Sequence, residues 1–277
     1  MACQPLVTFA WTLLVLAMSE SAGAIPYTRN TRELPMMVPD KETGARVAKW
    51  TKEMNVNPEE LGSYFEGDIM ITRNTKRNGA TDESLRWPNC VVPYEINGDF
   101  DDNQMALIQA AMDDYSQSTC IKFVPRTART DEEDYVSITS EDTGCHSNIG
   151  RIGGEQIVNL QIPGCVIKKG TVIHELMHAI GFWHEHTREE RDDYVDINWD
   201  NIQEEATGNF VKVSPGQTTA FGVPYDYGSV MHYTAYAFAK DDSQKTIITK
   251  DPNAEIGQRE GFSDSDIKKI NTMYQSA

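Results

Sequence analysis

The sequence lacks an apolar run long enough to cross a membrane. Its longest run, residues 6–18, is about 13 residues long, whereas a membrane-spanning helix needs roughly 20. Polar residues and then Ala22-Gly23-Ala24 follow, the small-x-small pattern that signal peptidase cleaves. We therefore expect a signal peptide at residues 1–24 and a secreted, extracellular protein. Because no Lys or Arg precedes the run, an uncleaved membrane anchor stays open as the alternative.

Positive charge is also scarce. The chain has 25 Lys and Arg against 42 Asp and Glu, a net charge of −17. Residues 1–77 hold nine of each sign, so the whole acidic excess lies in residues 78–277. An acidic surface repels phosphate backbones and anionic lipid. We expect no nucleic-acid or membrane partner, and we expect a monomer.

Cysteine is the third scarce residue, with five in the chain. One of them, Cys3, would leave with the signal peptide. An even number in an oxidising compartment predicts two disulfides, for which three pairings are possible. A disulfide between Cys145 and Cys165 would close a short loop and stabilise the fold by about 3 kcal/mol. The four that remain are Cys90, Cys120, Cys145 and Cys165.

A processing signal coincides with the change in charge. The pair Lys76-Arg77 lies in the polar stretch ITRNTKRNGA, the kind of exposed segment that trypsin-like or furin-like proteases cut. Cleavage would leave Asn78 as a new amino terminus. This divides the chain into a signal peptide (1–24), a prosegment (25–77) and a mature domain (78–277), although many dibasic pairs are uncut surface residues.

The mature domain is predicted to be α+β. Short β-branched and aromatic runs predict strands at residues 90–96, 120–126, 135–140 and 156–162. Apolar residues at helical spacing predict helices at 101–118, about 171–180 and 263–274. The remaining second half is rich in Gly, Pro, Asp and Asn, as loops are. We expect a mixed sheet with two helices, followed by an irregular half with a last helix.

The stretch HELMHAIGFWHEH, residues 174–186, carries the chemistry. His174 and His178 are four residues apart, so they lie on one helix face and can bind one ion. Glu175 can then reach a water on that ion. Gly181 can end the helix with a positive φ and turn the chain, which brings His184 to the same metal. Three ligands with an open position are typical of catalytic zinc, so we expect one such ion.

The extended motif resembles that of the metzincin metalloproteases, and TVIHELMHAIGFWHEHTREERDDYV (171–195) resembles the astacin family. YDYGSVMHY (225–233) resembles the astacin methionine turn, and YFEGDI (64–69) the family's inhibitory motif. The resemblance covers roughly residues 64–277. It implies a two-lobed zinc endopeptidase of protein or peptide substrates, with no accessory domain after the protease domain.

The resemblance also implies roles for single residues. Met231 lies beneath the zinc without binding it, and Tyr233 hydrogen-bonds the oxyanion. In the precursor, Asp68 occupies the open zinc position. After activation the terminus at Asn78 is linked to Glu185. His186 is expected to be a bystander, and His232 to have a structural role.

Two further expectations follow from the resemblance. The family's partner for Cys120 lies near the C-terminus, but no cysteine follows Cys165 here. We therefore infer that Cys90 pairs with Cys120 and Cys145 with Cys165, with an unpaired or intermolecular Cys90 as the alternative. We also expect residues 156–161 to form the cleft's edge strand. Arg259 either selects an acidic residue after the scissile bond or lies on the surface.

The implied reaction is peptide-bond hydrolysis by a zinc-activated water, with Glu175 as general base and acid. Two rival functions stay open: a catalytically inactive binding protein that kept the fold, and an extracellular module with structural zinc. Activity of an activated sample separates the first rival from a protease. The effect of chelation on the fold separates the second.

Overall fold

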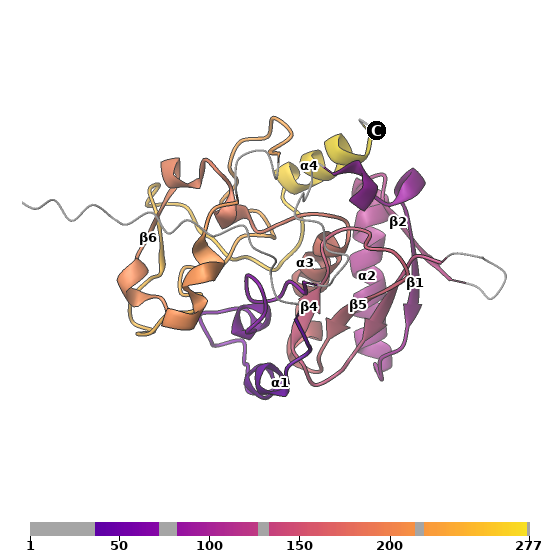
Figure 1. Ribbon diagram of the computed structural model, residues 1–277, viewed down its shortest axis with the longest axis horizontal. Coiled ribbons are helices and arrows are strands. Elements are labelled where there is room, and N and C mark those ends of the chain that lie inside the picture. Colours follow the sequence, from indigo (N-terminus) through magenta and orange to yellow (C-terminus); the bar gives the residue numbers. More distant parts are fainter. Residues whose placement is uncertain (1–36, 72–81, 127–132, 214–218, 276–277) are drawn as a thin grey trace, which may run out of the picture. The chain divides into compact units, whose positions relative to one another are not determined.

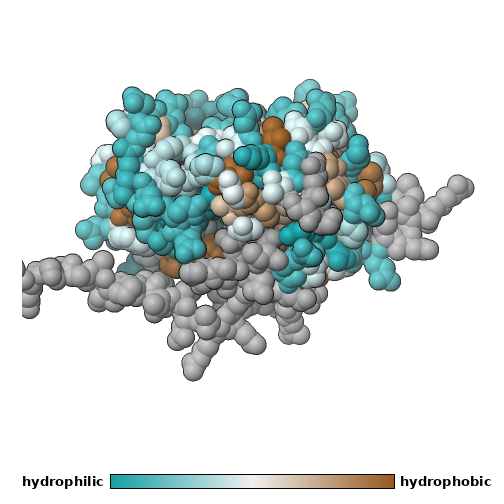
Figure 2. Space-filling view, turned by 90° about the horizontal axis from the view of Figure 1, so that it is seen from above, coloured by the Kyte–Doolittle hydropathy of each residue, from teal (hydrophilic) through white to brown (hydrophobic). Residues whose placement is uncertain are grey.

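The computed structural model describes residues 37–71, 82–126, 133–213 and 219–275. The predicted signal peptide and the activation site at Arg77 and Asn78 lie outside these residues. Within the described ranges, no helix is long and apolar enough to cross a membrane. The face in Figure 2 is mostly hydrophilic, with apolar residues in small separate groups.

A mixed five-stranded sheet forms one part of the domain. Its order is β2-β1-β3-β5-β4, where β2, β1, β3 and β5 are parallel and β4 is antiparallel to β5. The edges of this sheet are therefore β2 and β4, and the expectation that residues 156–161 form the cleft's edge strand was wrong. The bounds are β1 (Val91–Ile96), β2 (Lys122–Pro125), β3 (Tyr135–Thr139), β4 (Cys145–Ser147) and β5 (Glu155–Leu160).

Two helices pack side by side against this sheet (Figure 1). Helix α2 (Asp102–Ser118) begins with a capping box between Asp101 and Gln104 and buries Ile108, Ala111, Met112 and Tyr115. The Tyr115 hydroxyl donates to the carbonyl of Ile173 at 2.8 Å. That carbonyl belongs to α3 (Lys169–Ala179), so α2 supports the helix that carries the histidine motif.

The second half is mostly 3₁₀ turns and loops around a small sheet of β6 (Val195–Ile197) and β7 (Ile247–Thr249). The last helix, α4 (Asp264–Gln275), starts at a capping box. The Ser263 hydroxyl accepts from the Asp266 N–H at 3.0 Å, and the Asp266 carboxylate accepts from the Ser263 N–H at 3.1 Å. Ile270, Met273 and Tyr274 join the core of the five-stranded sheet. The α+β prediction is confirmed.

The described part of the predicted prosegment, residues 37–71 (called the prosegment below), is folded onto the other described residues. Its helix α1 (Lys41–Val47) starts at Asp40, whose carboxylate accepts from the N–H groups of Glu42 and Thr43. After it, the 3₁₀ turn Pro58–Leu61 and the segment up to residue 71 are largely buried. Figure 1 shows these indigo segments beside α3 and β4.

One disulfide joins Cys145 at the start of β4 to Cys165. The structure does not join Cys90 to Cys120, the second pair inferred above; both carry thiols. The two thiols are nevertheless in hydrogen-bonding contact, and burial followed by that contact raises the pKa of Cys120 to about 12. Their proximity is compatible with a disulfide, so this pairing stays a prediction.

Candidate metal centre

Helix α3 presents two imidazoles on one buried face. The rings of His174 and His178 lie edge to face, with centroids 4.7 Å apart. Nδ1 of His174 is 2.8 Å from the Val230 carbonyl, and Nδ1 of His178 is 2.7 Å from the Phe182 carbonyl. A ring that donates from Nδ1 keeps the lone pair of Nε2 for a metal. Both side chains are therefore oriented as ligands.

Gly181 makes the turn that brings in the third imidazole. Its φ is +111°, and a Cβ at this position would lie 2.8 Å from Cε of Met273. A residue with a side chain would be strained by the dihedral angle and crowded by the methionine. After the turn, the His184 ring lies 5.2 Å and 4.7 Å from the rings of His174 and His178, measured between centroids.

Asp68 of the prosegment completes the group. Its Oδ2 is 3.0 Å from Nε2 of His174 and 3.3 Å from Nε2 of His184, and its Oδ1 is 3.4 Å from Nε2 of His178. One donor atom from each residue lies within 4.8 Å of the others, and all four residues are buried. Burial opposes ionisation of Asp68, but His184, His178 and His174 hold its pKa well below the usual range.

The donor set fits one zinc ion. Three imidazole nitrogens and a carboxylate oxygen are its common ligands in four-coordinate sites. Among the described residues, Nε2 of His178 and Oδ1 of Asp68 have no hydrogen-bond partner. Buried polar atoms rarely stay without one, and these two atoms both belong to the converging group.

Glu175 follows the first ligand and is fully buried. Neither carboxyl oxygen has a hydrogen-bond partner in the part of the chain that the structure describes. Burial raises the pKa of this carboxyl well above its usual value, and the charges of Asp68 and Glu59 raise it further. Two of the groups responsible, Asp68 and Glu59, belong to the prosegment.

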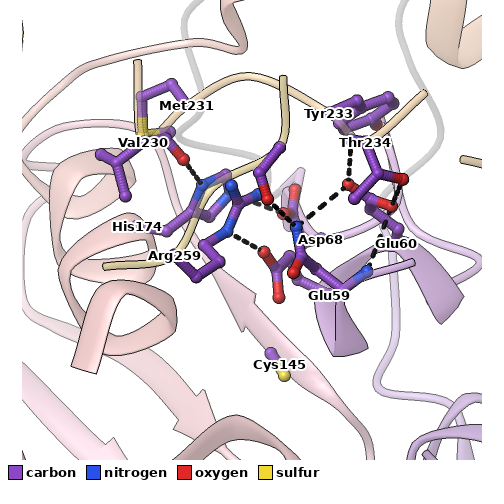
Figure 3. A network of polar contacts seen from close by, with 12 residues as sticks. Glu59, Glu60, Asp68, Cys145, His174, Val230, Met231, Tyr233, Thr234 and Arg259 are labelled. Atoms are coloured by element: carbon purple, nitrogen blue, oxygen red, sulfur yellow. Dashed lines mark hydrogen bonds and ion pairs between the residues drawn. The ribbon is translucent and has the colours of Figure 1, made fainter. Parts of the chain in front are cut away.

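The predicted methionine turn lies next to the ligands (Figure 3). The Val230 carbonyl orients His174, and the neighbouring Met231 is buried. The Tyr233 hydroxyl donates to the backbone carbonyl of Glu66 in the prosegment. Tyr233 is therefore held by the inhibitory motif itself.

His186 and His232 are not part of the metal group. His186 was expected to be a bystander, yet its ring stacks on that of Tyr233 at 3.8 Å between centroids. Its Nε2 is 3.0 Å from the Asn209 carbonyl. His232 has a structural contact, with Nε2 2.7 Å from the Tyr225 hydroxyl. No local pattern signals the stacking, because Tyr233 and His186 lie far apart along the chain.

Glu185 lies at a cavity of about 280 Å³ that Lys269 and Arg188 also line. Its carboxylate is 2.8 Å from Nζ of Lys269 and 2.6 Å from a nitrogen of Arg188. It also accepts from the N–H of Asp226 at 2.9 Å. Although burial opposes it, the two cations lower the pKa of Glu185. In this structure the carboxylate is therefore already paired with two cations.

Arg259 is buried, with 1% of its surface exposed, so the surface alternative was wrong. Its guanidinium is paired with Glu59 of the prosegment and donates to the His232 carbonyl. The residue after Glu59, Glu60, accepts from the N–H and hydroxyl of Thr234 at 2.7 and 2.6 Å. Figure 3 shows both acidic residues reaching these groups. Neither glutamate was predicted, since an acidic pair usually lies in solvent.

The inhibitory motif is a tight turn that leads along the edge of the sheet. Glu66 and Gly67 have positive φ angles of 47° and 85°. Ile69 then pairs in parallel with Ser147 of β4. The Ser147 N–H donates to the Asp68 carbonyl at 3.0 Å, and the Met70 N–H donates to the Ser147 carbonyl at 2.8 Å. The prosegment thus occupies the hydrogen-bonding edge of β4.

Comparisons with known proteins agree with this geometry. The profile of the astacin family of peptidases matches residues 79–275. The chain is 43% identical over 217 residues to zinc metalloproteinase nas-7 of Caenorhabditis elegans, covering 78% of this chain and 55% of that protein. It is 40% identical over 227 residues to the low choriolytic enzyme of Oryzias latipes, covering 79% and 81%.

A solved structure is also similar. High choriolytic enzyme 1, a hatching enzyme zinc-protease from Oryzias latipes, matches with a TM-score of 0.63 and 41% identity, over 69% of this chain and 92% of that one. The chain spans about half the length of nas-7 and nas-13, 55% and 48% respectively. The profile match and these relatives show that the chain belongs to the astacin family of zinc metallopeptidases.

Proposed function

We propose that the protein is a secreted zinc endopeptidase, made as a latent precursor, that cleaves internal peptide bonds of extracellular proteins as a monomer. The convergence of His174, His178, His184 and Asp68 on one point, next to Glu175, carries this proposal. The relatives' names, which include zinc metalloproteinases and a zinc-protease, support it.

Zinc, when bound, supplies a Lewis acid that acidifies water and polarises a carbonyl. His174, His178 and His184 would hold the ion through Nε2, and the Val230 and Phe182 carbonyls orient the first two rings. Glu175 accepts the proton of the attacking water and delivers it to the leaving amine. Tyr233, once released from the Glu66 carbonyl, donates to the oxyanion. One well-placed donor of this kind contributes about 2.7 to 4 kcal/mol.

Latency follows from what the prosegment covers. Asp68 takes the position at which the water would be activated, and Glu66 holds the Tyr233 hydroxyl. The run beside β4 blocks the edge to which substrate would add as an antiparallel strand. Since residues 69–70 run parallel to β4, the prosegment passes the metal group in the direction opposite to such a substrate.

Activation requires a trypsin-like or furin-like protease that cuts after Arg77. The new amino terminus at Asn78 then enters the cavity beside Glu185. Support comes from a buried anionic carboxylate at a cavity of about 280 Å³. The ammonium group of that terminus would be repelled by the nearby cation of Lys269. We therefore expect a water molecule between the terminus and the Glu185 carboxylate.

Specificity for an acidic residue directly after the scissile bond is proposed to come from Arg259. The buried guanidinium holds a glutamate of the prosegment in the latent state. Removing Glu59 leaves a buried cation without that partner, which favours a substrate carboxylate in its place.

The test is cleavage of denatured protein after tryptic activation, with trypsin inhibited before the assay. We expect activity in the activated sample, and loss of it in Glu175→Gln at unchanged zinc content. An activated sample with one zinc per chain and no cleavage would show an inactive binding protein. Chelation that unfolds the domain would point to structural zinc.

A further inference from the structure

Tyr64 of the prosegment fills a slot in the protease domain beside the metal group. The side chain is almost fully buried. Its ring meets the His146 ring edge to face, with centroids 4.9 Å apart and planes at 73°. Its hydroxyl donates to the Thr143 carbonyl at 2.7 Å and accepts from the Asp40 N–H at 2.8 Å. The slot thus receives both a ring and a hydroxyl donor.

The walls of the slot lie in β4 and in the segment just before it. His146 lies in β4 and is paired with Asn159 of β5, and its Nε2 is 3.2 Å from Oγ1 of Thr143. The Asn159 side-chain amide donates to that Oγ1 at 3.1 Å and to the Gly144 carbonyl at 2.6 Å. Because none of these contacts involves the prosegment, the slot should persist after activation, when Tyr64 and Asp40 have left.

The slot lies on the side of the cleft that follows the scissile bond. Ser147, which bonds to the Asp68 carbonyl, marks the position of the metal group along β4. His146 and Thr143 precede it in the chain. In a substrate antiparallel to β4, residues after the scissile bond lie beside the earlier residues of the edge.

We propose that in the activated enzyme this slot is a substrate subsite for a tyrosine side chain, located after the scissile bond. This rests on the proposed protease function and on antiparallel substrate binding. A phenol supplies the ring for His146 and the donor for the Thr143 carbonyl. Phenylalanine fills the same space but leaves a buried carbonyl without its donor, a loss that discriminates strongly between the two side chains.

The first experiment measures binding alone. A synthetic peptide of residues 37–71 is titrated into the activated Glu175→Gln protein, which does not consume it. We expect Tyr64→Phe to weaken binding about tenfold, because the hydroxyl's bonds to the Thr143 carbonyl and the Asp40 N–H are lost. Tyr64→Ala also loses the ring contact and should weaken binding about 100-fold. Replacing the exposed Val38 (68% exposed) with Ala in the same peptide is the matched control and should change little.

A double-mutant cycle distinguishes loss of the Tyr64–His146 contact from general destabilisation of the protein. With His146→Ala protein, Tyr64→Ala should cost several-fold less than with the parent protein, because the ring contact is already absent. Ile157→Ala on β5, where the side chain is 39% exposed, is the control on the protein side. Equal costs in all three proteins would overturn the proposed contact.

The second experiment measures selectivity in cleavage. In a peptide library, we expect one position after the scissile bond at which tyrosine exceeds phenylalanine about tenfold in kcat/KM. Because His146 contacts the ring, we expect His146→Ala to lower kcat/KM for both aromatic side chains at that position. Cleavage without a tyrosine preference at any such position would refute the subsite and leave the protease function intact. Absence of all cleavage would refute the protease function, and the binding cycle would still decide whether the slot recognises tyrosine.

Discussion

Replacing Asp68 with alanine tests whether its carboxylate keeps the precursor latent. The carboxylate is buried and 3.0 to 3.4 Å from three imidazole nitrogens. Removing one partner of a buried ionic contact typically costs about 3 to 5 kcal/mol. The ratio of docked to undocked prosegment should therefore fall by roughly 100- to 3,000-fold.

Other contacts will keep part of the prosegment in place. Glu59 stays paired with Arg259, and Phe65, Ile69 and Ile71 stay buried in one apolar cluster. Each such side chain contributes about 1.5 to 3 kcal/mol. We therefore expect activity in the uncut Asp68→Ala precursor that is well above the parent precursor and below the fully activated enzyme.

The assay uses the full chain with Lys76 and Arg77 both replaced by Ala, so that no cleavage at this site intervenes. A quenched fluorescent peptide reports activity, and zinc content is measured in every sample. Glu42→Ala removes an exposed carboxylate from the same prosegment and should leave latency unchanged. If uncut Asp68→Ala is as latent as its parent at equal zinc content, the carboxylate is not the switch.

The remaining predictions concern pH, cysteine and metal. Burial raises the pKa of Glu60 to about 7 from 4.5. Its contribution to prosegment docking is therefore full below pH 4.5 and is lost as the pH rises through about 7. The affinity of the 37–71 peptide should fall from about pH 5 to about pH 8, and Glu60→Gln should flatten that profile. Protein secreted by cells should lack free thiols by mass spectrometry, and Cys90→Ser should lower the free energy of unfolding by about 3 kcal/mol; a free Cys120 in the parent protein would refute the pairing. Chelation of the activated enzyme should abolish cleavage while circular dichroism keeps its folded signal, and added zinc should restore activity.

Local patterns predicted the elements whose signal lies in consecutive residues. Helices α2, α3 and α4 all depend on apolar neighbours within four positions of one another. Strand β4 was missed because three residues, Cys145–Ser147, carry too little periodicity. Placing the edge of the sheet on residues 156–161 failed for the same reason, since strand order depends on a short strand that pattern analysis did not detect.

In the candidate metal centre, too, local patterns predicted some residues and missed others. The HExxH spacing and the glycine turn indicate three ligands because one helix and one turn bring them together. The contacts of Glu59, Glu60 and His186 depend on segments that lie far from them in sequence. Glu59, for example, meets Arg259, which is 200 positions away. No local pattern can signal that an acidic pair will be buried against distant groups.

The turn at Gly181 packs against the last helix. Met273 of that helix fills the space that a side chain at position 181 would occupy, and the Tyr274 hydroxyl donates to the Ile180 carbonyl at 2.8 Å. Chains are synthesised from the amino terminus, and domains generally fold as their residues emerge. The prosegment therefore leaves the ribosome long before α4 does. The third histidine gains its final support only when α4 has emerged, so the predicted prosegment is synthesised before completion of the metal centre that we propose it inhibits.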